Sequence, residues 1–359
     1  MQFARPALSL AVALAVAACV TRPAPVAAAK PRLHAIQERY VSPAVLGDEL
    51  DSLATWTNGD GSIWVIASAK SRHQLVVFDA DSGDRLHTAG ARGSAPGEFQ
   101  RPNGLAVSGD SLFVVERDNR RVQVLALPGF APIATFGEGL RSPYGIWLHE
   151  TAPGELEVFV TDSFMKGERF DVVPPLAELD QRVRRYRVQL GDGSLEARGL
   201  GAFGDTTQAG ALRMVESIAG DPTHDRLLIA DEDRRHGSNL REYRMAGVAT
   251  GRSLPYDTFE GEAEGVALWS CSDEGGYWIA VDQQAPRTSF HVFDRITLAP
   301  VGSFAGRVTA QTDGIALHAA PTARFPSGAL FAVHDDRALA AFDLGDVIDA
   351  LGLDPACRR

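Results

Sequence analysis

The sequence predicts an all-β protein, a six-bladed β-propeller, on three observations. A short apolar run that begins with a polar residue followed by Gly or Ser recurs six times along the 359 residues. Each copy is followed by two further short apolar runs, with turn-forming residues between several of them. The copies start 52, 41, 72, 48 and 49 residues apart, and repeats of this length are typical of propeller blades.

The first run of each repeat is predicted to be the innermost strand of a blade. Helix-like patterning is weak outside residues 344–351, which disfavours a parallel α/β fold. The six first runs are Asp51-Ser-Leu-Ala-Thr, Asn103-Gly-Leu-Ala-Val, Tyr144-Gly-Ile-Trp-Leu, Glu216-Ser-Ile-Ala-Gly, Glu264-Gly-Val-Ala-Leu and Asp313-Gly-Ile-Ala-Leu. The second runs are 64–67, 112–115, 158–161, 227–230, 277–281 and 330–333, and the third runs are 75–78, 122–125, 183–188, 240–244, 290–293 and 339–342.

Three segments depart from the simple repeat. Residues 164–182 make the long gap and are expected to form a loop on one face. A propeller closes by borrowing a strand from the far terminus, so segment 34–41 is expected to complete the last blade. Residues 93–107 with 117–125 resemble an NHL repeat, which supports a propeller in the second blade.

The N-terminus is predicted to be a secretion signal that ends in a lipid anchor. Residues 1–18 combine a basic start with an apolar core, and the stretch up to Cys19 has the form of a lipobox. An ordinary cleavage site is the alternative. We expect a lipidated tether over 19–33 and a single propeller over 34–359. Because Val20 rather than Asp follows Cys19, we expect a lipoprotein of the cell envelope, at the outer membrane or the periplasmic face, with no other membrane contact.

Composition excludes several classes of protein. The net charge of −11 argues against a nucleic-acid binder. There is no CxxC motif, and the nine histidines form no HExxH or HxH cluster, so a zinc site is not expected. Cys271 and Cys357 could form a disulfide or remain as two thiols, and the sequence leaves this open. We expect a monomer.

Acidic residues are predicted to gather at one mouth of the propeller. The innermost strands start around one opening of the central channel, and four of the six residues at those starts are acids: Asp51, Glu216, Glu264 and Asp313. Glu262 adds another acid. The ends of the second runs add Ser68, Glu116, Asp162, 231–233, Asp282 and 334–336. Each acid alone could simply occupy a turn. Together, without histidine or cysteine, they suit Ca²⁺ with oxygen ligands.

Basic residues follow several second runs on the same face and could hold phosphate groups. An acidic mouth repels a phosphorylated molecule, but a bound cation inverts that sign. Ordinary surface charge is the alternative for each of these residues. They are Lys70, Arg72, Arg117, Arg120, Lys166, Arg234 and Arg235.

Over roughly residues 45–343 the chain resembles the β-propeller phytases, Ca²⁺-dependent enzymes that hydrolyse inositol hexakisphosphate. The motifs are Asp51-Ser-Leu-Ala-Thr-Trp56, Tyr144-Gly-Ile, Val215-Glu216 with Asp231-Glu232-Asp233, Glu262-Ala-Glu-Gly265 and Thr312-Asp313-Gly314-Ile315. Two departures are Ser52, where the family has a calcium-binding aspartate, and Ser217, where it has glycine.

The resemblance implies a phosphomonoester hydrolase that acts on phytate or a related phosphorylated small molecule, with Ca²⁺ as cofactor. It assigns catalysis to Glu216, Tyr144 and Asp231. Calcium ligands would be Asp51, Glu216, Asp231, Glu262, Glu264 and Asp313. Phosphate would contact Lys70, Arg72, Arg117, Arg120 and Tyr144.

Two other classes of function remain open. The first is a non-catalytic, NHL-like propeller of the cell envelope that binds a partner or ligand, which Ser52 and the NHL-like blade favour. The second is a lactonase or esterase that uses a metal in the central channel.

Overall fold

The computed structural model describes residues 1, 32–191, 193–255 and 257–358. The expected signal segment beyond Met1, the lipidation site Cys19 and nearly all of the expected tether lie outside these residues. The described residues from 32 onward form one compact unit. Within the described ranges, no helix has the length and apolar character needed to cross a membrane.

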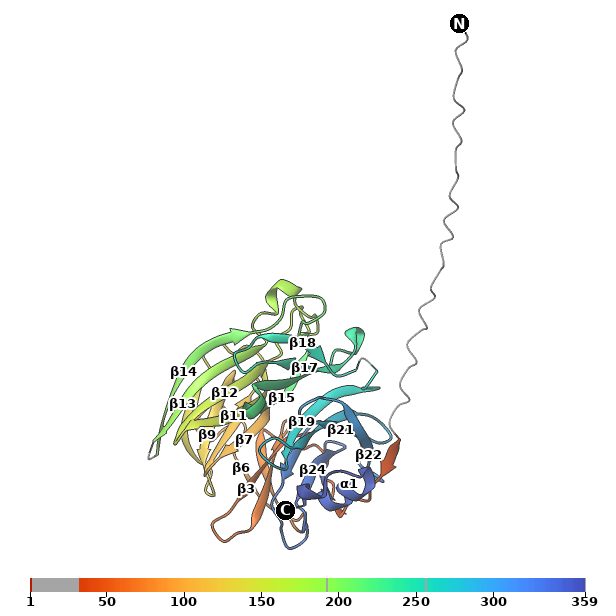
Figure 1. Ribbon diagram of the computed structural model, residues 1–359. Helices are drawn as coiled ribbons and strands as arrows, with labels where there is room; N and C mark the ends of the chain where they lie inside the picture. Colours follow the sequence, from red (N-terminus) through yellow and green to blue (C-terminus); the bar gives the residue numbers. More distant parts are fainter. Residues whose placement is uncertain (2–31, 192, 256, 359) are drawn as a thin grey trace. The chain divides into compact units, whose positions relative to one another are not determined.

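The all-β prediction is confirmed, because six small sheets form the six blades of a propeller (Figure 1). The inner strands contact one another in the closed order β3, β7, β11, β15, β19, β23 and back to β3. Each blade contains four antiparallel strands, and in blade six one of the four comes from the N-terminal end of the described chain. Blade five has a fifth strand at its outer edge, which pairs parallel. The strands are β3 (Leu50–Thr57), β4 (Ile63–Ala69), β5 (Gln74–Asp79) and β6 (Arg85–Ala89) in blade one; β7 (Pro102–Ser108), β8 (Ser111–Glu116), β9 (Arg121–Ala126) and β10 (Ala131–Phe136) in blade two; β11 (Pro143–Ala152), β12 (Glu155–Asp162), β13 (Val183–Gly191) and β14 (Ser194–Phe203) in blade three; β15 (Val215–Asp221), β16 (Arg226–Asp231), β17 (Asn239–Tyr243) and β18 (Ala249–Ser253) in blade four; β19 (Glu262–Ser270), β20 (Gly276–Gln283), β21 (Ser289–Asp294) and β22 (Pro300–Ala305) in blade five; and β23 (Ile315–His318), β24 (Ala329–His334) and β25 (Ala338–Asp343) in blade six.

Apolar seams between neighbouring blades hold the ring together. In one seam, Ala54, Ile66 and Val77 of blade one pack against Leu112 and Val114 of blade two. The middle strands are the most buried, and every residue of β16 is inaccessible to solvent or nearly so. Packing sheet against sheet in this way removes the apolar faces of all six blades from water.

The N-terminal segment closes the ring in two places. Strand β2 (Tyr40–Val41) pairs antiparallel with β25 and completes blade six, as the sequence predicted. Strand β1 (Leu33–Ala35) instead pairs parallel with β22 of blade five. Between them, Glu38 accepts hydrogen bonds from the backbone N–H groups of Arg307, Val308 and Thr309. The segment 34–41, which was predicted to complete one blade, therefore connects blades five and six.

The C-terminal end packs on blades five and six. Helix α1 (Leu344–Leu351) matches the one stretch with helical patterning and is the single α-helix of the described chain. Cys271, at the turn after β19, forms a disulfide with Cys357. The two alternatives that the sequence left open for these cysteines are thereby resolved. The long gap in blade three is a loop between β12 and β13 that contains a short 3₁₀ segment, Leu176–Glu178.

A bulge recurs at the same place in the first strand of five blades. In blade one the pairing shifts between Leu50 and Leu53, and the same shift occurs in β7, β11, β15 and β19. The residue at each shift is the one that the sequence placed at the channel mouth. A bulge re-aims a side chain and interrupts pairing, so it frees these residues from the ladder. In blade six the strand begins just after Asp313 and Gly314.

The small residue after each bulged residue is required by the close approach of neighbouring inner strands. A Cβ atom on Gly145 would lie 2.5 Å from the carbonyl oxygen of Glu216, and one on Gly314 would lie 2.3 Å from that of Asp51. At Ser217 the hydroxyl donates to the carbonyl oxygen of Glu264 instead. These contacts run from blade to blade around the mouth.

We expect Gly314→Ala to destabilise the protein by about 1–3 kcal/mol, because the new methyl group must displace backbone atoms of the adjoining blade. Gly59→Ala is the matched control, since Gly59 is exposed and has no atom within 4 Å of an added Cβ. Urea unfolding of both variants measures the difference. Equal midpoints for Gly314→Ala and Gly59→Ala would contradict the close-approach explanation.

Candidate functional site

The acidic residues predicted at the mouth do come together in the structure. Glu216 has a raised pKa because it is buried and because the carboxylates of Glu232 and Asp51 lie near it. Glu264 has a raised pKa from burial and from Glu216, Glu232 and Asp313. Acids from blades one, four, five and six therefore lie in one another's electric field.

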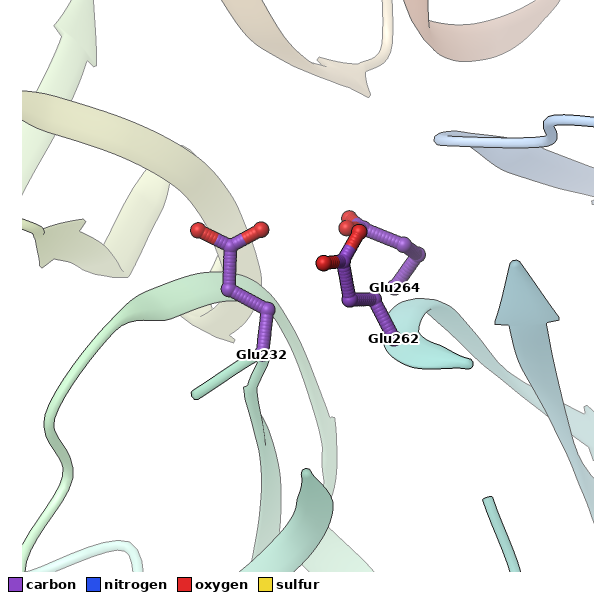
Figure 2. Close-up of side chains that lie close together, drawn as sticks. All are labelled: Glu232, Glu262 and Glu264. Carbon is purple, nitrogen blue, oxygen red and sulfur yellow. The ribbon is translucent and has the colours of Figure 1, made fainter. Parts of the chain in front are cut away.

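Three glutamates form the tightest group. One carboxylate oxygen each from Glu232, Glu262 and Glu264 lies within 4.8 Å of the others. Figure 2 shows the Glu232 carboxylate facing those of Glu262 and Glu264, which extend from β19. Glu262 and Glu264 are two positions apart near the start of this strand, and Figure 2 shows both carboxylates on the side of Glu232. Glu232 is the first residue after β16.

This group has the charge and spacing of a site for a hard cation. Two oxygens that bind one Ca²⁺ at about 2.3–2.6 Å can be at most about 5 Å apart, and the three oxygens satisfy that limit. Glu264 is 7% exposed. Burial raises the pKa of Glu232 to about 7, with Glu262 adding to the effect. In the described chain, none of the three forms an ion pair with a basic residue.

Asp231, which the sequence assigned to the metal and to catalysis, has a different role in the structure. Its two oxygens accept backbone N–H groups of Arg213 at 3.1 Å and Met214 at 2.9 Å. It is 2% exposed, and the guanidinium of Arg241 lies 3.5 Å away. Consecutive residues leaving a strand point in opposite directions, so Glu232 occupies the mouth. Alternation separates these two neighbouring acids only once the last residue of β16 is known.

Other acids at the ends of second strands share this structural role. Asp162 accepts the N–H groups of Arg141 and Ser142. Asp282 accepts those of Glu260 and Gly261. In the NHL-like blade, Glu116 pairs with Arg121 at 2.5 Å and accepts an N–H group in the loop before β7. These buried acids fix the loop that enters each blade, which corrects the expectation that they add to the mouth.

Lys70 lies among the acids on the opposite side of the mouth. Its Nζ is 2.5 Å from Asp51 Oδ2, 3.7 Å from Asp313 Oδ2 and 3.8 Å from Glu49 Oε1. Burial lowers the pKa of the ammonium, and the negative charges of Asp51 and Asp313 raise it. The effect of the charges is the larger, so the pKa lies above its ordinary value. The mouth thus has one side that carries its own cation and another side that does not.

Two further residues of the expected site adjoin the ring. Tyr144 has its pKa raised to about 12. Burial is the larger cause, and the negative charge of Glu216 adds to it. Arg117 forms a hydrogen bond with the Tyr144 hydroxyl. The phenol therefore stays protonated at neutral pH, next to a guanidinium.

The other basic residues expected to bind phosphate are exposed to solvent. Arg72 has a side chain that is 52% exposed and lies 3.5 Å from Asp48. Arg120 is exposed and has a left-handed backbone conformation. Lys166 pairs with Glu178 inside the blade-three loop, and Arg235 pairs with Asp233. Of the expected phosphate ligands, the structure brings Lys70, Arg117 and Tyr144 close to the acids.

A cavity of about 400 Å³ lies at the centre of the propeller. Residues from the first strands of all six blades line it, and many are small or apolar. Its lining includes Ser52, Gly104, Gly145, Ser217, Gly265 and Gly314, each of which directly follows a residue of the mouth.

Comparisons with known proteins support the fold. No family model matches the chain, and no curated protein matches it. Among solved structures, the chain is similar to hydrazine synthase from Kuenenia stuttgartiensis, with a TM-score of 0.51 and 12% identity over 88% of this chain and 82% of that one. At that identity the likeness shows a shared propeller fold alone. Membership of the phytase family stays a prediction.

Proposed function

We propose that the protein is a Ca²⁺-dependent phosphomonoester hydrolase that acts on phytate or a related phosphorylated small molecule. One observation carries the proposal: the carboxylates of Glu232, Glu262 and Glu264 converge without a basic partner among the described residues. The motifs that resemble β-propeller phytases support the same conclusion. The lipid anchor and the location in the cell envelope remain part of this proposal.

Different residues of the mouth would bind the cation and the phosphate. Glu232, Glu262 and Glu264 would hold the cation, with Glu216 next to them. The chemistry that a divalent cation would supply there is polarisation of a phosphoryl oxygen and a lower pKa for a bound water. The Tyr144 hydroxyl and the Arg117 guanidinium would donate hydrogen bonds to a phosphate. Lys70 adds a fixed positive charge on the side of Asp51 and Asp313.

The test is phosphate release from phytate by the folded protein, with millimolar Ca²⁺ and with a chelator. We expect release with Ca²⁺ and its loss with the chelator. A simple aryl phosphate serves as a second substrate, so that phytate specificity and phosphatase action are measured separately. A folded protein that releases no phosphate from either substrate in either condition would contradict the proposal.

A non-catalytic binding propeller is the second candidate, and one observation favours it. The Ser52 hydroxyl donates a hydrogen bond to Asp51 at 2.8 Å. The β-propeller phytases, which the sequence resembles, have a second aspartate at the position of Ser52, so this side of the mouth has one carboxylate fewer than theirs. Thermal stabilisation by Ca²⁺ without hydrolysis of any phosphate ester would support this candidate. A panel of carboxylic esters and lactones, assayed in parallel, distinguishes the esterase alternative.

A further inference from the structure

The ammonium group of Lys70 stands where three carboxylates converge. Oxygens of Asp51, Asp313 and Glu49 lie 2.5, 3.7 and 3.8 Å from its Nζ atom. The side chain is 14% exposed, so it extends into the mouth and away from bulk water. Lys70 is the only basic residue that pairs with Asp51 or Asp313 in the ion pairs of the described residues.

Neutral donors hold the two aspartates in this arrangement. The Ser52 hydroxyl donates to Oδ1 of Asp51, and the Gln283 amide donates to Oδ1 of Asp313. Each aspartate therefore turns its other oxygen, Oδ2, toward Lys70. Carboxylates fixed in this way around one point make a cage that suits a cation.

We propose that Lys70 is a built-in cation that fills this cage, so that the protein binds one divalent cation at Glu232, Glu262 and Glu264 and excludes a second from Asp51, Asp313 and Glu49. The inference rests on the cation binding in the proposed function and adds the number of ions. The ammonium repels a divalent ion that approaches the same carboxylates, because both carry positive charge. Glu49 also pairs with Arg101 at 2.7 Å, so the carboxylates left without a cation when Lys70 is removed are those of Asp51 and Asp313. These two then repel each other, and a divalent ion relieves that repulsion.

The experiment counts Ca²⁺ ions per folded chain by isothermal titration calorimetry. We expect one ion for the wild-type protein and two for Lys70→Met, which keeps the length of the side chain and removes its charge. Lys166→Met is the matched control, because Lys166 pairs with Glu178 on the surface, and its count should stay at one. Adding Asp51→Asn to Lys70→Met should return the count to one.

Two or more ions in the wild-type protein, or one ion in folded Lys70→Met, would overturn the inference and leave the proposed function standing. No ion in either protein would remove the inference together with the cation of the proposed function. Should Lys70→Met fail to fold, Asp51→Asn in the wild-type background decides. It should still bind one ion with affinity within a few-fold of wild type, and loss of that ion would refute the inference.

Discussion

Replacement of Glu264 by Gln is expected to lower kcat/KM for Ca²⁺-dependent phosphate release by at least about 100-fold. Glu264 is 7% exposed and belongs to the group of three glutamates. The substitution keeps the shape of the side chain and removes one of three charges that would hold the cation. Loss of an outer partner of a metal ligand already costs about 10–100-fold, so loss of a ligand should cost at least that much. Initial rates of phosphate release over a range of Ca²⁺ concentrations measure the effect.

Glu178→Gln is the matched control for this substitution. Glu178 pairs with Lys166 in the exposed loop of blade three, so its loss should leave the rate unchanged. The Glu264→Gln protein should also be at least as stable as wild type in chelator, because one buried, repelled charge has been removed. Activity within a few-fold of wild type in Glu264→Gln would contradict the assignment of the cation to this group.

In the presence of a chelator, the protein is expected to lose stability as pH rises from about 4.5 to 7. Glu232 has its pKa raised from 4.5 to about 7 in the folded state. Within this window the folded state keeps a proton that the unfolded state has released, so each rise in pH favours unfolding. The contribution of this one group is on the order of 3 kcal/mol, fully present below pH 4.5 and lost above pH 7. Urea midpoints measured across this range test the sign.

The comparison with Glu232→Gln isolates this contribution from those of other titrating groups. The variant should show a smaller loss of stability over the same window. Ca²⁺ should act in the opposite sense and stabilise the wild-type protein most above pH 7, because its ligands must be deprotonated. Identical pH profiles for wild type and Glu232→Gln in chelator would show that Glu232 is not a buried, repelled acid.

The sequence was sufficient to predict the blades and the ring, because both depend on a repeat. A glycine or serine is needed wherever neighbouring inner strands nearly touch, as at Gly145 and Gly314. That local requirement recurs six times and is visible in the residues. The resulting prediction placed Asp51, Glu216, Glu264 and Asp313 around one mouth, and the structure brings their charges together.

The direction of individual side chains could not be predicted in the same way. Asp231 and Glu232 are adjacent acids, and the exchange of one for the other depends on where β16 ends. The sequence offered Lys70 as a phosphate ligand, whereas the structure turns it toward Asp51 and Asp313. The pairing of β1 with blade five also depends on contacts between residues about 270 positions apart, such as Leu33 and Ser303. No local pattern encodes such a contact.

Crystals soaked with a lanthanide that replaces Ca²⁺ would test the central claim most directly, because anomalous scattering locates the ion itself. The predicted result is one strong peak bounded by the carboxylates of Glu232, Glu262 and Glu264. That peak should be absent from crystals of Glu264→Gln soaked in the same way. A well-ordered mouth without a peak, or a peak at Asp51 and Asp313 with Lys70 displaced, would contradict the account.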